Sequence, residues 1–121
     1  VTIPKNVYIT DWLPAHIVNP MAKIAVIHGG QGTVQTAVSS GTPFIGIGLQ
    51  PEQEANIDLI VRQGSARRIR KHELTAIRLK SEILNLLSDS IAFDKAKVLA
   101  DYVKKYNGDE LIVKYISEII G

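Results

Sequence analysis

The sequence predicts an α/β fold, in which a parallel sheet is flanked by helices and followed by a helical C-terminal tail. Two short apolar runs rich in branched residues, 24–27 and 44–47, are typical of buried strands. A segment with helical spacing of apolar residues follows each run, and strands that alternate with helices form parallel sheets. A glycine-rich stretch at 28–33 joins the first run to its helix, as at the carboxyl end of a parallel strand.

The first elements are short. Residues 7–10 are predicted to form a strand, and residues 15–21 a helical turn that Pro20 interrupts. After the strand at 24–27 comes a helix at 32–40. Gly41 follows this helix and is placed to end it, because glycine adopts the left-handed backbone that commonly closes a helix.

The next elements complete the predicted sheet. The run 44–47 is continuously apolar, which predicts a strand buried on both faces. A helix is expected over 52–63 with Gly64 as its end, and a short strand over 66–69. The residues of this helix expected to face inward are Ala55, Leu59 and Ile60.

From residue 74 onward the pattern indicates helices only. Thr75 is placed to cap a helix that runs to about residue 87, and a second helix spans about 91–106. Asp109 caps a last helix that reaches residue 120. This last helix packs on the sheet or meets another domain or partner, because it carries a wide apolar stripe. The stripe consists of Leu111, Ile112, Tyr115, Ile116, Ile119 and Ile120.

Composition fits one domain, or part of one, over residues 1–121. The chain has no cysteine, which excludes disulfides and cysteine metal sites, and its three histidines lack metal-ligand spacing, so no metal is expected. A net charge of +2 is too small to indicate nucleic-acid binding. No apolar run approaches the ~20 residues of a membrane span, and the first residues do not resemble a signal peptide. A cytoplasmic location is therefore expected.

The stretch 28–33 carries the strongest functional signal. Glycines permit a sharp turn and the close approach of a ligand to the backbone. The first N–H groups of the following helix lack partners within that helix and point outward. A helix start of this kind favours anions, so the sequence predicts a phosphate-binding loop.

Several motifs occur together in a fixed order. They resemble the nucleotide-sugar signature of GT-B glycosyltransferases, in particular UDP-glucuronosyltransferase-like enzymes and the bacterial transferases that glycosylate antibiotics. The match covers residues 6–70, and the helices of 74–121 are compatible with it. The resemblance implies a Rossmann-like C-terminal donor-binding domain. The motifs are Asp11-Trp12-Leu13-Pro14, His28-Gly29-Gly30-Gln31-Gly32-Thr33, Ala37, Gly41-Thr42-Pro43, Glu52-Gln53 and Asn56.

The resemblance gives the matching residues roles in nucleotide binding. Trp12 and the backbone of Leu13 resemble the platform for the base, although a tryptophan here also suits a core plug at a strand end. His28 resembles the histidine that contacts the diphosphate; the alternative is a histidine with its hydrogen bonds satisfied at a strand end. The diphosphate cradle would be Gly30, Gln31, Gly32 and Thr33. Thr33 also suits a helix cap.

Other matching positions concern the sugars. Many relatives carry glutamate where this chain has Thr36, and that glutamate binds the ribose hydroxyls; a threonine makes at most a weaker contact, as in some antibiotic-type members. Glu52 and Gln53 resemble the pair that holds the donor sugar's hydroxyls. Glu52 alone also suits the first turn of a helix, where a carboxylate is favourable. Ala15 stands where plant-type members often have glutamine.

The resemblance leaves catalysis outside this chain, since the family's catalytic base lies in an N-terminal domain. We therefore expect a fragment of a hexosyltransferase, or one subunit of a split one, that uses a UDP- or dTDP-sugar without a metal or other cofactor. The alternative is a non-catalytic partner or regulatory subunit. An unrelated Rossmann-like nucleotide-binding protein is disfavoured, because no GxGxxG motif follows the first strand. The basic stretch 67–71 is interpreted as a solvated strand edge and loop, because no aromatic residues interleave it.

Overall fold

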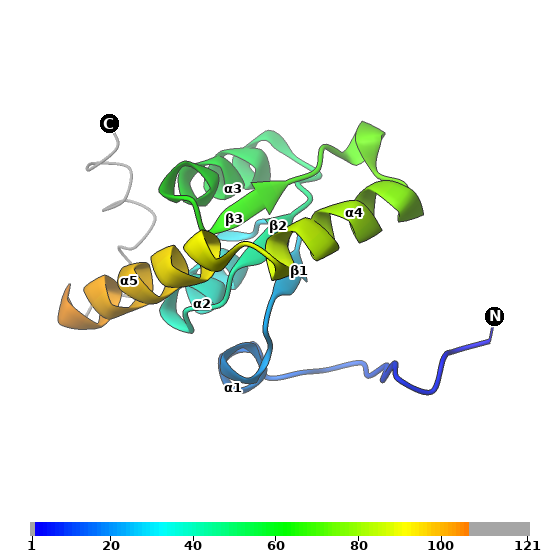
Figure 1. Ribbon diagram of the computed structural model, residues 1–121, viewed down its shortest axis with the longest axis horizontal. Helices are drawn as coiled ribbons and strands as arrows, with labels where there is room; N and C mark the ends of the chain where they lie inside the picture. The colour runs from blue at the N-terminus through cyan, green and yellow to red at the C-terminus, as the bar shows by residue number, and fades with distance from the viewer. Residues whose placement is uncertain (1, 107–121) are drawn as a thin grey trace.

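The computed structural model describes residues 2–106 and contains one parallel sheet with the strand order β1-β2-β3 (Figure 1). This arrangement confirms the predicted α/β fold. The strands are β1 (Ala25–Ile27), β2 (Phe44–Gly46) and β3 (Ala66–Arg68). The α-helices are α1 (Ala15–Val18), α2 (Gln31–Ser39), α3 (Pro51–Gln63), α4 (Ala76–Leu87) and α5 (Ser90–Tyr106). Two 3₁₀ helices complete the set, η1 (Asn19–Met21) and η2 (Lys71–Glu73).

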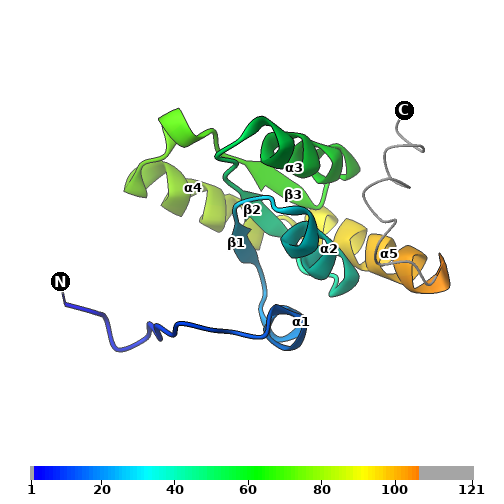
Figure 2. The same ribbon diagram turned by 180° about the vertical axis from the view of Figure 1, so that it is seen from behind.

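The sheet has helices on both faces because neighbouring residues of β2 point in opposite directions. Phe44 packs with α2, α3 and the second half of α5, whereas Ile45 packs with α4 and the start of α5. Figures 1 and 2 show α2 and α4 on opposite sides of the sheet. All three residues of β2 are buried, as its continuously apolar sequence predicts.

Strand β1 is an edge of the described sheet. The N–H of Ala25 donates to the carbonyl of Pro43 at 3.0 Å, and the N–H of Ile47 donates to the carbonyl of Ile27 at 2.8 Å. Since alternate residues of a parallel strand bond to opposite sides, the backbone polar groups of Val26 point away from β2. Val26 is 46% exposed, and no strand of the described part of the chain pairs with this edge.

The helix boundaries agree closely with the sequence expectations. Gly41 and Gly64 have positive φ values of 69° and 91° after α2 and α3, as expected of helix-ending glycines. Thr75 caps α4, because its hydroxyl oxygen accepts the N–H of Arg78 at 3.0 Å. The helix expected over 109–120, with its apolar stripe, lies outside the described residues.

The strand expected at 7–10 is wrong. This segment belongs to no strand of the described chain, and Val7, Tyr8 and Ile9 are exposed. Branched and aromatic residues favour extended backbone, but a strand forms only where a neighbouring strand satisfies its N–H and C=O groups. Local sequence therefore predicted a strand where the described chain offers no pairing partner.

Two further expectations need correction. Ala55 is exposed, whereas Asn56, Ile57 and Ile60 are the buried residues of α3. The inward face of the helix is shifted because a polar residue, Asn56, occupies a buried position, where its side chain is hydrogen-bonded to backbone.

The basic stretch 67–71 is also less solvated than expected. The Arg67 guanidinium lies 2.7 Å from the carboxylate of Asp89, and that of Arg68 lies 3.0 Å from Asp58. Both arginine side chains are only partly exposed. The acidic partners could not be assigned from the sequence because they lie on other elements.

Candidate functional site

The loop after β1 holds the predicted phosphate-binding residues. His28 is exposed, and its Nδ1 accepts a hydrogen bond from the N–H of Gly30 at 3.2 Å. A neutral imidazole with an accepting Nδ1 carries its proton on Nε2. Nε2 has no hydrogen-bond partner among residues 2–106, so His28 can donate one hydrogen bond to a ligand.

Gly29 fixes the loop against α3. Its φ is +88°, and a Cβ atom built there would lie 2.6 Å from Cδ1 of Ile57 and 2.7 Å from the backbone carbonyl of Gln53. The side-chain amide of Asn56 donates to the carbonyl of Gly29 at 3.0 Å. Helix α3 thus fixes the position of the loop, and the first turn of α3 lies next to the loop.

The start of α2 presents unpaired backbone donors. Gly30 is the N-cap and α2 begins at Gln31, so Thr33 is the third helical residue and the idea that it caps the helix is wrong. Helix geometry leaves the N–H groups of Gln31, Gly32 and Thr33 without a carbonyl partner inside α2. A Cβ atom built on Gly32 would meet no atom of the described residues within 4 Å. The structure therefore places the four cradle residues at the start of α2 directly after His28, and Gly32 faces open space.

Thr36 lies one turn further along α2. Its hydroxyl donates to the carbonyl of Gly32 at 2.8 Å, so the hydroxyl offers a ligand only its lone pairs. Thr36 borders a cleft of about 520 Å³ between α2 and the α1–η1 segment. The cleft is lined by His16, Pro20, Gly32, Gln35, Thr36, Ser39, Ser40 and Lys104.

Trp12 and Leu13 lie on the segment that precedes α1. The side chain of Trp12 is 75% exposed, so the alternative that it plugs the core is wrong. Leu13 is exposed as well. The hydrogen bonds of Trp12 within the described residues are with Thr10, so none of them connects its backbone or indole to the loop 28–33.

Glu52 and Gln53 occupy the first turn of α3. Glu52 is exposed, and Gln53 is partly buried. The Oε1 atom of Gln53 accepts the N–H of Leu49 at 2.8 Å, which leaves the side-chain NH₂ group to donate elsewhere. The pair therefore offers a ligand one carboxylate acceptor and one amide donor.

A residue next to this pair, Glu54, was not predicted from the sequence. Glu54 lies within ion-pair distance of two arginines, Arg68 and Arg70, that belong to the basic stretch. The available signal was an acidic residue in the first turn of α3 and a basic stretch at the end of the next strand. Adjacent parallel strands bring these two segments to the same edge of the sheet.

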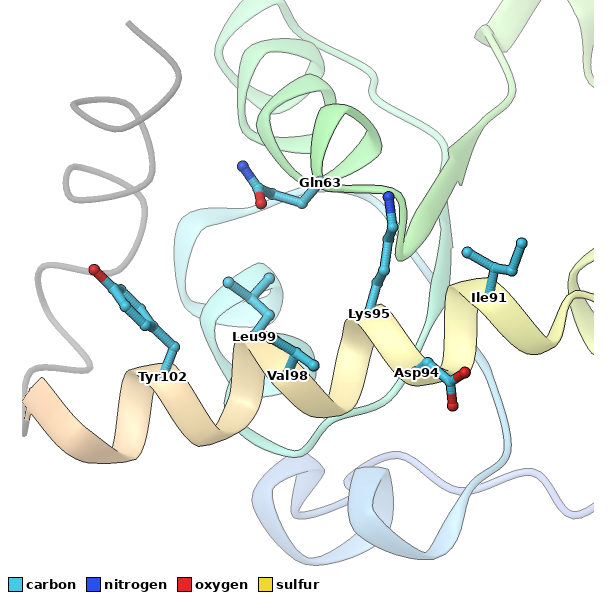
Figure 3. A pocket seen from close by; sticks show the side chains of 7 residues that line it. All are labelled: Gln63, Ile91, Asp94, Lys95, Val98, Leu99 and Tyr102. Atoms are coloured by element: carbon cyan, nitrogen blue, oxygen red, sulfur yellow. The ribbon is translucent and has the colours of Figure 1, made fainter.

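A larger groove than the cleft at Thr36 lies elsewhere. Figure 3 shows that it runs along α5 with one contribution from α3, and its volume is about 710 Å³. None of the predicted site residues lines it. Its lining residues are Gln63, Ile91, Asp94, Lys95, Val98, Leu99 and Tyr102.

Within residues 2–106, no group of three or more His, Asp or Glu side chains is arranged to hold a metal ion. The helices in that range are too short or too polar to cross a membrane.

Replacing Asn56 by alanine is expected to destabilise the protein by about 1–3 kcal/mol, because the buried carbonyl of Gly29 loses its donor. Thermal unfolding of the two proteins measures the change. Asn85→Ala is a suitable control, since Asn85 is exposed on α4. An unfolding temperature equal to that of the unmodified protein would show that water replaces the lost donor without cost.

Comparison with known proteins places the chain in a family. Residues 1–117 match the family model described as "Erythromycin biosynthesis protein CIII-like, C-terminal domain". The chain is 29% identical over 100 residues to the PGL/p-HBAD biosynthesis rhamnosyltransferase of Mycobacterium bovis (strain BCG / Pasteur 1173P2). That alignment covers 83% of this chain and 22% of the relative.

Solved structures have the same fold. The glycosyltransferase of kitacinnamycin superposes with a TM-score of 0.80 at 30% identity, over 95% of this chain and 30% of that one. The glycosyltransferase VinC, solved in complex with dTDP, superposes with a TM-score of 0.79 at 23% identity, over 98% of this chain and 29% of VinC. The chain thus spans less than a third of each protein that it matches here.

These matches confirm the resemblance drawn from the ordered motifs. The three-stranded sheet with its helices corresponds to part of the C-terminal domain of GT-B glycosyltransferases. The chain belongs to the family of erythromycin biosynthesis protein CIII-like C-terminal domains.

Proposed function

We propose that this chain is the donor-binding part of a glycosyltransferase that moves a hexosyl group from a UDP- or dTDP-sugar to an acceptor. The observation that carries the proposal is the loop 28–33, where an imidazole donor precedes the unpaired amides at the start of α2 and Gly32 faces open space. The family match and the dTDP complex of VinC support a nucleotide ligand of this kind.

The roles follow from the donors and acceptors at each position. Nε2 of His28 and the N–H groups at the start of α2 would hold the diphosphate and stabilise its charge as it departs. Trp12 would stack on the base, with the backbone of Leu13 beside it. Thr36 would accept a single hydrogen bond from the ribose, while Glu52 and Gln53 would hold the sugar hydroxyls.

The rest of the reaction would use groups outside this chain. The base that deprotonates the acceptor would belong to an N-terminal domain or a separate subunit, and transfer would invert the anomeric carbon. The diphosphate would be stabilised without an obligatory metal. Within the chain, residues 6–70 would form the donor-binding core, and residues 74–121 would support it. A cytoplasmic location also remains a prediction, which cell fractionation would check.

The first test is a titration that follows the fluorescence of Trp12, the only tryptophan of the chain. We expect UDP or dTDP to change this fluorescence saturably, and GDP or NAD to do so much more weakly. The complete polypeptide encoded by the gene should then consume the matching sugar nucleotide in the presence of an acceptor. Equal responses to all four nucleotides, or none in a folded protein, would contradict the proposal.

A further inference from the structure

Glu54 is the residue on which a further inference rests. It follows Glu52 and Gln53 in the first turn of α3, but its Oε2 atom is buried and has no hydrogen-bond partner among residues 2–106. That atom lies 3.6 Å from Nη1 of Arg70 and 3.9 Å from Nε of Arg68. A carboxylate oxygen withdrawn from water is held here by two positive charges.

The two arginines connect α3 to the end of β3. Nη1 of Arg68 also contacts Asp58 at 3.0 Å, so its guanidinium lies between two carboxylates one turn apart on α3. Arg70 lies just beyond β3, before η2. The contacts therefore fix the rotation of the first turns of α3 relative to the sheet.

The carboxylate of Glu54 also packs against the loop between β2 and α3. A Cβ atom built on Gly48 would lie 2.7 Å from its Oε1 atom, so the loop backbone passes directly over it. One residue earlier, the Oε1 atom of Gln53 accepts the N–H of Leu49 at 2.8 Å. Two consecutive side chains of α3 thus hold consecutive residues of the same loop.

We propose that Glu54, clamped by Arg68 and Arg70, is a positioning residue for the donor sugar. It holds the loop 48–50, and this contact fixes the hydrogen bond that orients the amide of Gln53. The free NH₂ group of Gln53 then points in one direction, and Glu52 keeps its place beside it. This inference rests on the proposed function, because it concerns how the sugar end of the same ligand is recognised.

The test compares binding of a nucleotide with binding of its sugar nucleotide. In the complete polypeptide, calorimetry gives the Kd for UDP and dTDP. It then gives the Kd for UDP-glucose, UDP-glucuronate, dTDP-glucose and dTDP-rhamnose. The sugar nucleotide that binds most tightly is used to compare the variants. In Glu54→Gln the nucleotide Kd should stay within about twofold, whereas the sugar nucleotide should bind roughly fivefold more weakly, the effect of about one hydrogen bond. Glu54→Asp, which keeps the charge, should recover part of this loss.

Glu82→Gln is the matched control. Glu82 is also a partly buried glutamate paired with an arginine, since Arg78 lies 3.6 Å away, but both residues belong to α4. This variant should lose comparable stability and keep the affinity for the sugar nucleotide. If Glu54→Gln does not fold, Arg70→Gln removes a cation of the same clamp and should give the same selective loss.

The outcomes separate the two proposals. If the unmodified protein binds neither UDP nor dTDP, the proposed function fails and the role of Glu54 fails with it. Suppose instead that a nucleotide binds, and that Glu54→Gln either weakens the binding of nucleotide and sugar nucleotide equally or weakens the binding of neither. The proposed function then stands, and the positioning role of Glu54 is overturned.

Discussion

Replacing His28 by alanine is expected to weaken the binding of UDP or dTDP by roughly 10- to 100-fold, the usual effect of losing a hydrogen bond to a charged group. The alanine removes the Nε2 donor, and it also removes the Nδ1 acceptor that holds the N–H of Gly30. Because the imidazole is exposed, the unfolding temperature should change little. The fluorescence of Trp12 reports the affinity.

His72→Ala is the control for this result. His72 is exposed on η2 and lines the small cleft beside Glu54, not the loop 28–33. Its loss should leave the affinity for UDP and dTDP, which carry no donor sugar, unchanged. Equal affinities of His28→Ala and the unmodified protein would show that the diphosphate does not use this imidazole.

The largest effect on stability is expected for Gly29→Ala, which should lower the free energy of unfolding by about 2–4 kcal/mol. The left-handed backbone at φ +88° costs a residue with a Cβ about 1 kcal/mol, and forcing a methyl group into a filled space costs about 1–3 kcal/mol more. The methyl would lie 2.7 Å from the backbone carbonyl of Gln53, which cannot rotate away. Urea unfolding measures the loss.

Gly32→Ala is the matched variant in the same loop. Within the part of the chain that the structure describes, a Cβ there meets nothing within 4 Å. Alanine favours helix over glycine by up to about 1 kcal/mol, so stability should be kept or increased. Nucleotide affinity should nevertheless fall, since the methyl enters the space proposed for the diphosphate. If Gly32→Ala bound UDP and dTDP as well as the unmodified protein, the cradle would lie elsewhere.

Helix ends and turns could be predicted from the sequence wherever one residue determines the local backbone conformation. Gly41 and Gly64 end their helices with positive φ, and Thr75 caps α4, because these effects depend on a few neighbouring residues. The placement of His28 and Gly30 at the start of α2 was predictable for the same reason. A strand, a glycine-rich turn and a helix follow one another directly in the chain.

Features that depend on distant contacts could not be predicted. The exposure of Ala55 and the burial of Asn56 follow from the position of Gly29, which is far away in the sequence. The same is true of Arg68, whose partners lie on α3. Hydrophobic periodicity describes the average face of a helix, whereas a single buried amide or ion pair depends on what packs against it.

The open edge of the sheet has a consequence for protein engineering. The strand that ends at the candidate loop is also the strand whose outer backbone groups point away from β2. Any polypeptide that pairs with Val26 will set the tilt of this strand, and the tilt determines where the imidazole of His28 lies. A chimera that joins this segment to a foreign acceptor-binding half should therefore be designed with the backbone pairing at Val26, as well as the linker, in mind.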